Sequence, residues 1–311
     1  MSDNNPQPLT NKIDFAVIIS VRRANPNGDP LNGNRPRQTY DGYGEISDVC
    51  LKRKLRNRLQ VMGEAIFVQS DDNRAPGDEF RSLNARFDAA NLADKRRDSC
   101  AKWFDVRAFG QVFPFKKKGE RTPKKGEAKQ AGSEEADSAE GNADAVSIGI
   151  RGPVTIQSAF SVEPITPDSL QIVKSVNLET ENPPEKKGKD TMGMKHRIGK
   201  ETVYVACGAI NTQLAQKTGF SATDADQLKK ALRSLFVNDE SSARPAGSME
   251  VVKVIWWQHN CPNGQHSSAT VHRSLKNVKI EKDGRVTYTL DELMGLKPEE
   301  LDELEGSGLQ P

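Results

Sequence analysis

The chain has 311 residues, a formal net charge of +2, 28% charged residues and 35% hydrophobic residues. This composition allows one sizeable core, and no apolar run approaches the roughly 20 residues that cross a membrane. Residues 1–8 lack the basic start and apolar centre of a secretion signal, and the four cysteines are scattered without a CxxC pair. We therefore exclude membrane, disulfide-stapled secreted and fibrous classes and expect a cytoplasmic protein.

The small net charge is the sum of two unlike parts. Residues 291–311 contain seven acids and one lysine, a net charge of −6, so residues 1–290 carry +8. The basic residues of that larger part occur in clusters, and clusters set the local field that a polyanion experiences. A single charge run is more often a solvated face, so only several runs on one surface would indicate a polyanion partner.

The N-terminal part of the chain predicts a strand, a shaped loop and a helix. Ile13–Val21 is an apolar strand, and the density of Asn, Gly, Asp and Pro over 25–34 is typical of a structured loop. A helix over Val49–Met62 begins after a cap at Ser47 or Asp48. Its apolar stripe consists of Leu51, Leu55, Leu59 and Met62. We expect Lys52, Arg53, Lys54, Arg56 and Arg58 to cover the exposed side.

The middle of the chain predicts a helix at Asp88–Trp103 and two strand-like runs within 146–165. Between them, 114–146 is rich in Lys, Gly, Ala, Ser and Glu and has almost nothing to bury, which predicts a mobile surface insertion. Strands at 171–178 and 201–216 flank a polar, basic excursion. Two strands around such an excursion predict a long projecting hairpin.

The remaining segments predict a helix at Asp224–Phe236 after a cap at Ser221 or Thr223, and a strand at Met249–Trp257. A hairpin joins 278–280 to 286–288, and the acidic tail 291–311 is expected to be a short helix or disordered. Without its insertions the order fits a βαββαβ, ferredoxin-like α+β layout with one sheet and two helices on one face.

Enzyme signatures are absent from the sequence: there is no GxSxG, no Walker A loop and no dinucleotide-binding glycine turn. Asp29 is the best-placed single acid, but we favour a role in bonding its own turn. A zinc site is a minor alternative, and its ligands would be His259, Cys261, His266 and His272. Only His259 and Cys261 are close in sequence, and the single residue between them is a shorter spacing than zinc ligands usually have.

Nucleic-acid binding has more support, because basic residues bracket the Asn-rich loop and continue along the next helix. If the first strand and that helix pack together, these cations could lie on one edge and neutralise phosphates. The residues are Arg22, Arg23, Arg35, Arg37, Lys52, Arg53 and Arg56. The aromatic pattern of base-stacking RRM domains is missing, so the sequence predicts sequence-independent backbone binding.

The basic excursion also contains an apolar pair, Met192 and Met194, which is expected at the hairpin tip beside Lys195, His196 and Arg197. Apolar side chains inserted next to basic ones can separate neighbouring bases. A methionine pair can equally pack against a neighbouring subunit. Both interpretations remain open from the sequence.

Several blocks, in order along residues 13–258, resemble the Cascade backbone family of CRISPR-associated proteins (the Cas-seven family of the RAMP superfamily), in particular its subtype I-C or Dvulg-type members. The blocks are Asn25-Pro26-Asn27-Gly28-Asp29-Pro30, Ile46 to Arg56, Asp105 to Gly110, Arg151 to Val154, Ser161 to Ile165 and Met192 to His196 before Val203-Tyr204. The ordered set is far more specific than any one short motif.

The resemblance implies an RRM-like palm with a finger region at 64–104, the charged insertion at 114–146, a thumb hairpin at 176–202 and the acidic tail. It implies a non-catalytic subunit without cofactor or metal. Copies would stack head to tail along CRISPR RNA, with other Cascade subunits, and leave bases free to pair with target DNA. Implied palm contacts are Arg22, Arg23, Asn25, Asn27, Lys52, Arg53 and Arg56, with Met192 to Arg197 as the thumb. The alternatives are a metal-dependent RNA-cleaving relative that uses Asp29, or a generic single-stranded RNA-binding protein.

Overall fold

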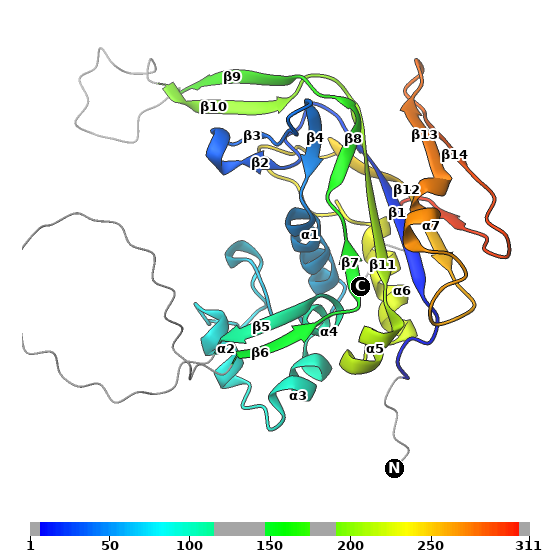
Figure 1. Ribbon diagram of the computed structural model, residues 1–311. Coiled ribbons are helices and arrows are strands. Elements are labelled where there is room, and N and C mark those ends of the chain that lie inside the picture. The colour runs from blue at the N-terminus through cyan, green and yellow to red at the C-terminus, as the bar shows by residue number, and fades with distance from the viewer. Residues whose placement is uncertain (1–6, 115–146, 175–190, 305–311) are drawn as a thin grey trace, which may run out of the picture.

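The computed structural model describes residues 7–114, 147–174 and 191–304. Its centre is one antiparallel sheet with the strand order β15-β12-β1-β11-β8-β4, and β7 also pairs with β11 (Figure 1). The strands are β15 (Glu299–Leu301), β12 (Met249–Gln258), β1 (Ile13–Val21), β11 (Thr202–Ile210), β8 (Ala159–Pro164), β4 (Tyr43–Ile46) and β7 (Val154–Ile156). The expected α+β class is confirmed.

β1 is the central strand because both of its neighbours pair with its whole length. It runs antiparallel to β11 from Ile13↔Ile210 to Val21↔Thr202, and to β12 from Ile13↔Gln258 to Val21↔Met249. All nine residues of β1 are buried, as its apolar sequence predicts. The strand order β12-β1-β11-β8, with one helix after β1 and another before β12, is the order expected for the predicted βαββαβ layout.

Two helices, α1 (Asp48–Val61) and α6 (Ala222–Arg233), pack against one face of this sheet. Both begin at predicted caps: Ser47 accepts the backbone N–H of Cys50, and Ser221 forms a reciprocal capping box with Asp224. Apolar side chains from both helices join the stacked rings of Phe15 and Trp256 in the main core. These two helix predictions are confirmed.

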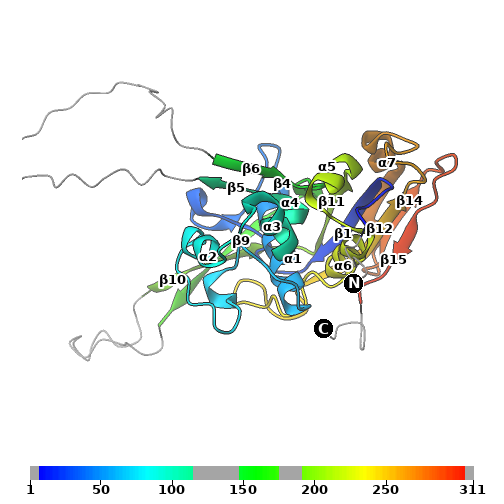
Figure 2. The same ribbon diagram turned by 90° about the horizontal axis from the view of Figure 1, so that it is seen from below.

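The opposite face of the sheet is covered by C-terminal elements. They are α7 (Ser268–Ser274) and the predicted hairpin, which forms as β13 (Leu275–Ile280) and β14 (Val286–Leu290). They bury a second, smaller cluster that includes Ile18, Trp257 and Val271. This layer occupies the part of the sheet around β1 and β12, as Figure 2 shows from below.

A third apolar core lies within residues 64–114 and 147–151, which include the predicted finger region at 64–104 and are called the finger region from here on. Its elements are the 3-10 turn η2 (Asp71–Asn73), α2 (Leu83–Ala89), α3 (Lys95–Lys102), α4 (Phe104–Phe109), β5 (Gly110–Pro114) and β6 (Ser147–Arg151). The aromatic rings of Phe67, Phe87, Trp103 and Phe113 pack against one another. The single helix predicted at 88–103 is wrong: Asn91 takes a positive φ of 46° and Asp94 caps a new helix, so α2 and α3 are separate.

The projecting hairpin consists of β9 (Pro167–Val173) and β10 (Thr191–Ile198), and 175–190 lies outside the described residues. β9 thus begins four residues before the strand predicted at 171–178, and residues 175–178 of that prediction lie outside the described residues. The strand predicted at 201–216 is too long, because the side chain of Asn211 caps α5 (Thr212–Thr218). The charged insertion falls almost wholly on 115–146, which also lies outside the described residues.

The acidic tail corrects another expectation. Instead of a helix, Glu299–Leu301 forms β15 on the edge of β12, where Glu299 pairs with Lys229 at 3.0 Å. Residues 305–311 lie outside the described part of the chain. The acidic residues Glu299 and Asp302 therefore neutralise Lys229 of α6 and Lys253 of β12. No helix in the described residues is long and apolar enough to cross a membrane.

Candidate nucleic-acid interface

The loop after β1 is shaped by its own asparagines. It contains β2 (Gly28–Asp29), the 3-10 turn η1 (Pro30–Asn32) and β3 (Arg35–Pro36). The amide of Asn25 donates to the backbone oxygen of Asn34 at 2.8 Å, and Oδ1 of Asn27 accepts the N–H and hydroxyl of Ser47, each at 2.9 Å. A Cβ at Gly28 would lie 1.9 Å from Oδ1 of Asn34, so any other residue here would displace the Asn34 side chain. Asn25 thus closes the loop on itself, and Asn27 joins the loop to the start of α1.

Four arginines surround this loop, and they differ in how far they are neutralised. Arg22 pairs with Glu201 (Nε to Oε1, 2.7 Å), and Nη2 of Arg37 lies 3.8 Å from Oδ1 of Asp29. Arg23 and Arg35 are exposed and have no carboxylate partner within the described residues. These two arginines are therefore the cations of the loop most available to a phosphate.

The cations of α1 do not all face solvent, which corrects the sequence prediction. Lys54 is buried and pairs with Asp239, and the guanidinium of buried Arg58 donates to the hydroxyl of Ser234 at 2.8 Å. Burial lowers the pKa of Lys54 despite that partner. Lys54 and Arg58 therefore do not lie on an exposed surface together with the cations of the Asn-rich loop.

Arg56 is also withdrawn from solvent. Its side chain is 13% exposed, and Nε lies 3.0 Å from Oδ2 of the buried Asp105. The same carboxylate accepts the backbone N–H groups of Phe67 and Val68 at 2.7 and 3.0 Å. Arg56 thus connects α1 to the finger region, which is a structural role that sequence reasoning missed.

The two other predicted cations of α1 lie nearer the surface. Lys52 forms an i,i+4 pair with Asp48 at 3.1 Å and keeps 26% of its side chain exposed. Arg53 donates to the backbone oxygen of Val68 at 2.7 Å and lines a groove of about 440 Å³ between α1 and the segment 235–244. Arg244 lines the same groove and pairs with Asp239 at 3.2 Å. No sequence motif marked Arg244, because only the folded chain brings it beside α1.

The predicted thumb residues lie on the stem strand β10, not at a hairpin tip. Met192 and Met194 are 67% and 52% exposed. His196 is buried and its Nδ1 lies 2.8 Å from the Ser169 hydroxyl, whereas Arg197 lies 3.9 Å from Asp168. Lys195 is half-buried opposite Leu170 of β9. On β10 the two methionines are therefore exposed to solvent, whereas His196 is buried.

β9 carries further exposed apolar side chains, and the register places Leu170 and Ile172 on the face of the hairpin opposite Met194. Leu170, Ile172 and Val173 are 41%, 36% and 51% exposed. The loop that carries Arg22, Arg23, Arg35 and Arg37 is called the arginine loop below. Its strand β3 contacts both β9 and β10, so the base of the hairpin adjoins the arginine loop (Figure 1). The arrangement combines cations that can hold a phosphate backbone with an apolar strand pair that can contact bases or another protein.

Asp29 and the three histidines of the zinc cluster considered above have structural partners. Oδ1 of Asp29 accepts the N–H of Leu31 at 3.2 Å, which is the expected turn-bonding role. His259 is buried against Asp14 at 2.8 Å, and the His272 ring lies 3.0 Å from the Gly208 oxygen. Within the described residues, no group of three or more His, Cys, Asp or Glu side chains is placed to hold a metal ion.

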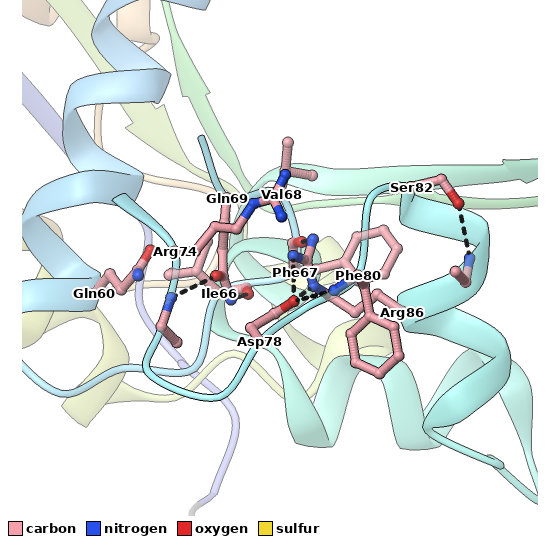
Figure 3. Close-up of polar contacts among 12 residues, drawn as sticks. Gln60, Ile66, Phe67, Val68, Gln69, Arg74, Asp78, Phe80, Ser82 and Arg86 are labelled. Carbon is pink, nitrogen blue, oxygen red and sulfur yellow. Dashed lines mark hydrogen bonds and ion pairs between the residues drawn. The ribbon is translucent and has the colours of Figure 1, made fainter. Parts of the chain in front are cut away.

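A cavity of about 280 Å³ in the finger region is lined by groups that largely bond one another (Figure 3). The guanidinium of Arg86 binds Asp78 through Nε at 2.8 Å and Nη2 at 3.0 Å, and it donates to the Phe67 oxygen at 2.7 Å. Gln69 bonds Ile66 and Ala75. These contacts explain how the finger keeps its shape.

Comparison with known proteins identifies the family. The chain matches the family model described as CRISPR-associated protein Cas7 over residues 11–293. The protein is therefore one of the CRISPR-associated proteins, and it belongs to their Cas7 family. The CRISPR-associated protein Cas7 of Haloferax volcanii is 33% identical over 112 residues. That alignment spans 34% of this chain and 33% of the relative, so it covers about a third of each.

Two solved structures are also similar. A chain of a CRISPR RNA-guided surveillance complex described as pre-nicking has a TM-score of 0.44 at 14% identity, covering 79% of this chain and 78% of that chain. A chain of another CRISPR RNA-guided surveillance complex has a TM-score of 0.43 at 16% identity, covering 79% and 68%. The family assignment rests on the sequence match.

Proposed function

We propose that this Cas7-family protein is a non-catalytic, RNA-binding backbone subunit of a CRISPR surveillance complex of subtype I-C. The observation that carries the proposal is the exposed arginine loop, with Arg23 and Arg35, adjoining an exposed apolar hairpin stem. Its partners would be CRISPR RNA, other copies of the chain, other Cascade subunits and, through the guide, target DNA. It would act in the cytoplasm and require no cofactor.

In the proposed mechanism, cations bind the RNA backbone and the apolar hairpin displaces bases. The arginine loop and Lys52 hold guide phosphates, which gives sequence-independent retention. Met192 and Met194 in the hairpin of each copy separate two neighbouring guide bases, so that bases are displaced at regular intervals along the RNA. The layer of α7, β13 and β14 already covers part of the sheet, which argues against the base stacking that an open sheet would allow. Bases between the hairpins remain free to pair with DNA.

The hairpin also supports self-association. Five large apolar side chains, on both faces of the β9–β10 hairpin, are at least 36% exposed, and exposed apolar side chains gathered on one projecting element are typical of an interaction site. A head-to-tail contact that does not close into a ring generates a helix of copies. Each copy then needs only a modest RNA affinity, because linked sites gain by avidity.

The test reverses two cations that have no carboxylate partner in the described structure. Arg23→Glu with Arg35→Glu should leave the melting temperature unchanged and reduce the guide RNA that co-purifies with the assembly by about tenfold or more. Lys282→Glu with Lys297→Glu, two exposed lysines elsewhere on the chain, is the control of equal charge change. Full RNA retention by the loop variant would show that the loop is not the RNA site.

The two alternatives give different results. A metal-dependent RNA-cleaving relative would cut target RNA and lose that activity in Asp29→Ala, although Asp29 here bonds its own turn. A generic single-stranded RNA-binding protein would co-purify with RNA of mixed length. The proposed backbone subunit should carry RNA of one uniform length and cleave none.

A further inference from the structure

The face of the central sheet that carries α7, β13 and β14 is only partly covered. This layer lies over the part of the sheet around β1 and β12, and β11, β8 and β4 extend the sheet to one side of it (Figure 1). On these three strands the uncovered side chains form a patch that we call the open sheet face. It consists of Tyr43, Glu45, Phe160 and Val205.

Strand register places two of these side chains on the face of the C-terminal layer. Phe160 pairs with Val205, and Val205 pairs with Ile18. Ile18 is buried in the cluster beneath the layer. Because directly paired residues of antiparallel strands lie on the same face, Phe160 and Val205 lie on the face that the layer leaves open.

The packing of Gly44 places the other two side chains. A Cβ at Gly44 would collide with the hydroxyl of Tyr204, which belongs to the main core on the helix side. Gly44 therefore faces the helices, and successive residues of a strand point to opposite faces. Its neighbours Tyr43 and Glu45 thus point to the open side, where Glu45 pairs with Phe160.

The open sheet face is apolar for a surface in contact with water. Antiparallel sheets with one solvated face normally carry polar side chains on that face. Here Phe160 is 45% exposed, Tyr43 is 36% exposed and Val205 is half-buried. Aromatic side chains are enriched at the centre of protein interfaces. The face therefore has the apolar centre that a protein-binding surface requires.

The charged residues of this region are all acidic. β4, β8 and β11 contain no lysine or arginine, although the chain has 45 such residues. Glu45 lies on the open sheet face, Asp41 is exposed just before β4, and Glu163 is exposed near the end of β8. Within the described residues these three carboxylates have no cation partner. Such a surface repels a nucleic-acid backbone and attracts a protein that carries lysine or arginine at its contact.

A second copy of the chain is not the partner that the remaining surfaces favour. The hairpin β9–β10 combines a cation with exposed apolar side chains, because Lys195 pairs with Leu170. The proposed function already assigns this hairpin to guide bases and to the contact between copies. A protein of different sequence is then needed to supply cations to the open sheet face.

We propose that the open sheet face binds a different protein subunit, whose contact surface carries lysine or arginine around an apolar side chain. The inference rests on the proposed function, because the hairpin is taken as the contact between copies. The apolar side chain of the partner packs on Phe160 and Tyr43, and its cations pair with the three carboxylates. Every copy in a stack has this face, so the partner binds at repeated positions along the assembly.

The first experiment identifies the occupant by cross-linking in the purified assembly, with all subunits of the complex co-expressed. The photoreactive substitution Phe160→p-benzoylphenylalanine keeps an aromatic ring at the centre of the open sheet face. Irradiation should join this chain to a lysine- or arginine-containing segment of one non-identical subunit, which mass spectrometry identifies. The control is Val112→p-benzoylphenylalanine, at an exposed position of β5, and it should not give that product.

The second experiment reverses the charge of the same region. Glu45→Lys with Glu163→Lys should lower the amount of that subunit per copy of this chain by about tenfold or more, because like charges are then brought together. Guide retention and the number of copies per assembly should stay unchanged. The control of equal charge change is Asp88→Lys with Asp226→Lys, two exposed acids elsewhere that have no cation partner within the described residues.

The outcomes separate this inference from the proposed function. A cross-link from Phe160 to another copy of this chain or to RNA overturns the inference, and so does the absence of any product. Unchanged subunit content in the charge-reversed variant, or loss of its guide RNA, also overturns it. If the wild-type assembly carries no RNA, the proposed function fails, whereas the cross-link still identifies what covers the open sheet face.

Discussion

At the scale of single residues, the cations of α1 show how charge in a sequence can serve the fold. Lys52 and Arg56 belong to the same run, and both were predicted to face an RNA backbone. Lys52 keeps a solvent-exposed i,i+4 partner, but Arg56 pairs with the buried Asp105. Removing one partner of a buried ion pair leaves the other uncompensated, whereas an exposed pair contributes little.

We therefore expect Arg56→Ala to lower the free energy of unfolding by about 3 kcal/mol. The matched control Lys52→Ala should lower it by less than about 0.5 kcal/mol. Urea denaturation followed by circular dichroism measures both values. If Arg56→Ala were no less stable than Lys52→Ala but had lost RNA, Arg56 would be an RNA contact and its pair with Asp105 would be incidental.

The sequence could not reveal this difference between neighbouring cations. Helical periodicity identified the apolar stripe of Leu51, Leu55 and Leu59, all of which are buried. It assigns charged positions to solvent by default. The partners of Lys54, Arg56 and Arg58 are Asp239, Asp105 and Ser234, and they come from segments 49 to 185 residues away. Only the tertiary fold brings such groups together.

At the scale of elements, the sequence predicted those helices and strands that depend on interactions between neighbouring residues. The apolar run of β1 and the serine caps of α1 and α6 were found where expected. The end of β11 was missed because Asn211, a cap, lies inside an otherwise strand-like sequence. β15 was missed because its stability comes from the edge of β12, and its own acidic sequence does not favour a strand.

The hairpin stem leads to an element-scale prediction. Met192→Thr with Met194→Thr keeps strand propensity but removes two exposed apolar side chains. In assembled complexes, guide retention should stay within about twofold because the cations are untouched. The periodic pattern of reactive bases in chemical probing of the RNA should weaken, because apolar insertion separates the bases.

The control for this prediction replaces two exposed apolar residues on other strands, Val112→Thr and Phe160→Thr. It should leave the probing pattern unchanged. Identical base reactivity in the wild type and in the methionine variant would mean that the stem packs against another protein and does not displace bases. That result would leave RNA binding by the arginine loop intact.

At the scale of the whole molecule, the two layers on the sheet are joined to it by different interactions. The helix side has a large apolar core, whereas the C-terminal side has a smaller cluster supported by buried polar contacts around Asp14. Asp14 lies on β1, is fully buried and contacts Lys12 at 2.9 Å and His259 at 2.8 Å. His272 of α7 lies 3.6 Å from its other oxygen.

The ring of His259 is held in its neutral form by these contacts. Nδ1 accepts the N–H of Gln265 at 2.9 Å, so Nε2 carries the proton that is donated to Asp14. Burial lowers the pKa of His259, and this effect outweighs the opposing effect of Asp14. Lys12 and His266, the other charged or titratable neighbours, also disfavour a protonated ring.

This buried histidine predicts acid sensitivity. Below the ordinary pKa of 6.5 the unfolded chain binds a proton that the folded chain does not, so the free energy of unfolding should fall as the pH drops from 6.5 through the lowered folded-state pKa. His259→Gln, whose amide can donate to Asp14, should flatten this dependence below about pH 6.5 in urea denaturation. Leu228→Ala in the main core should lower stability by a similar amount at every pH and keep the slope, because it removes no titrating group. A wild-type slope that persisted in His259→Gln would mean that another group links protonation to unfolding, and that the C-terminal layer is not held through the neutral histidine.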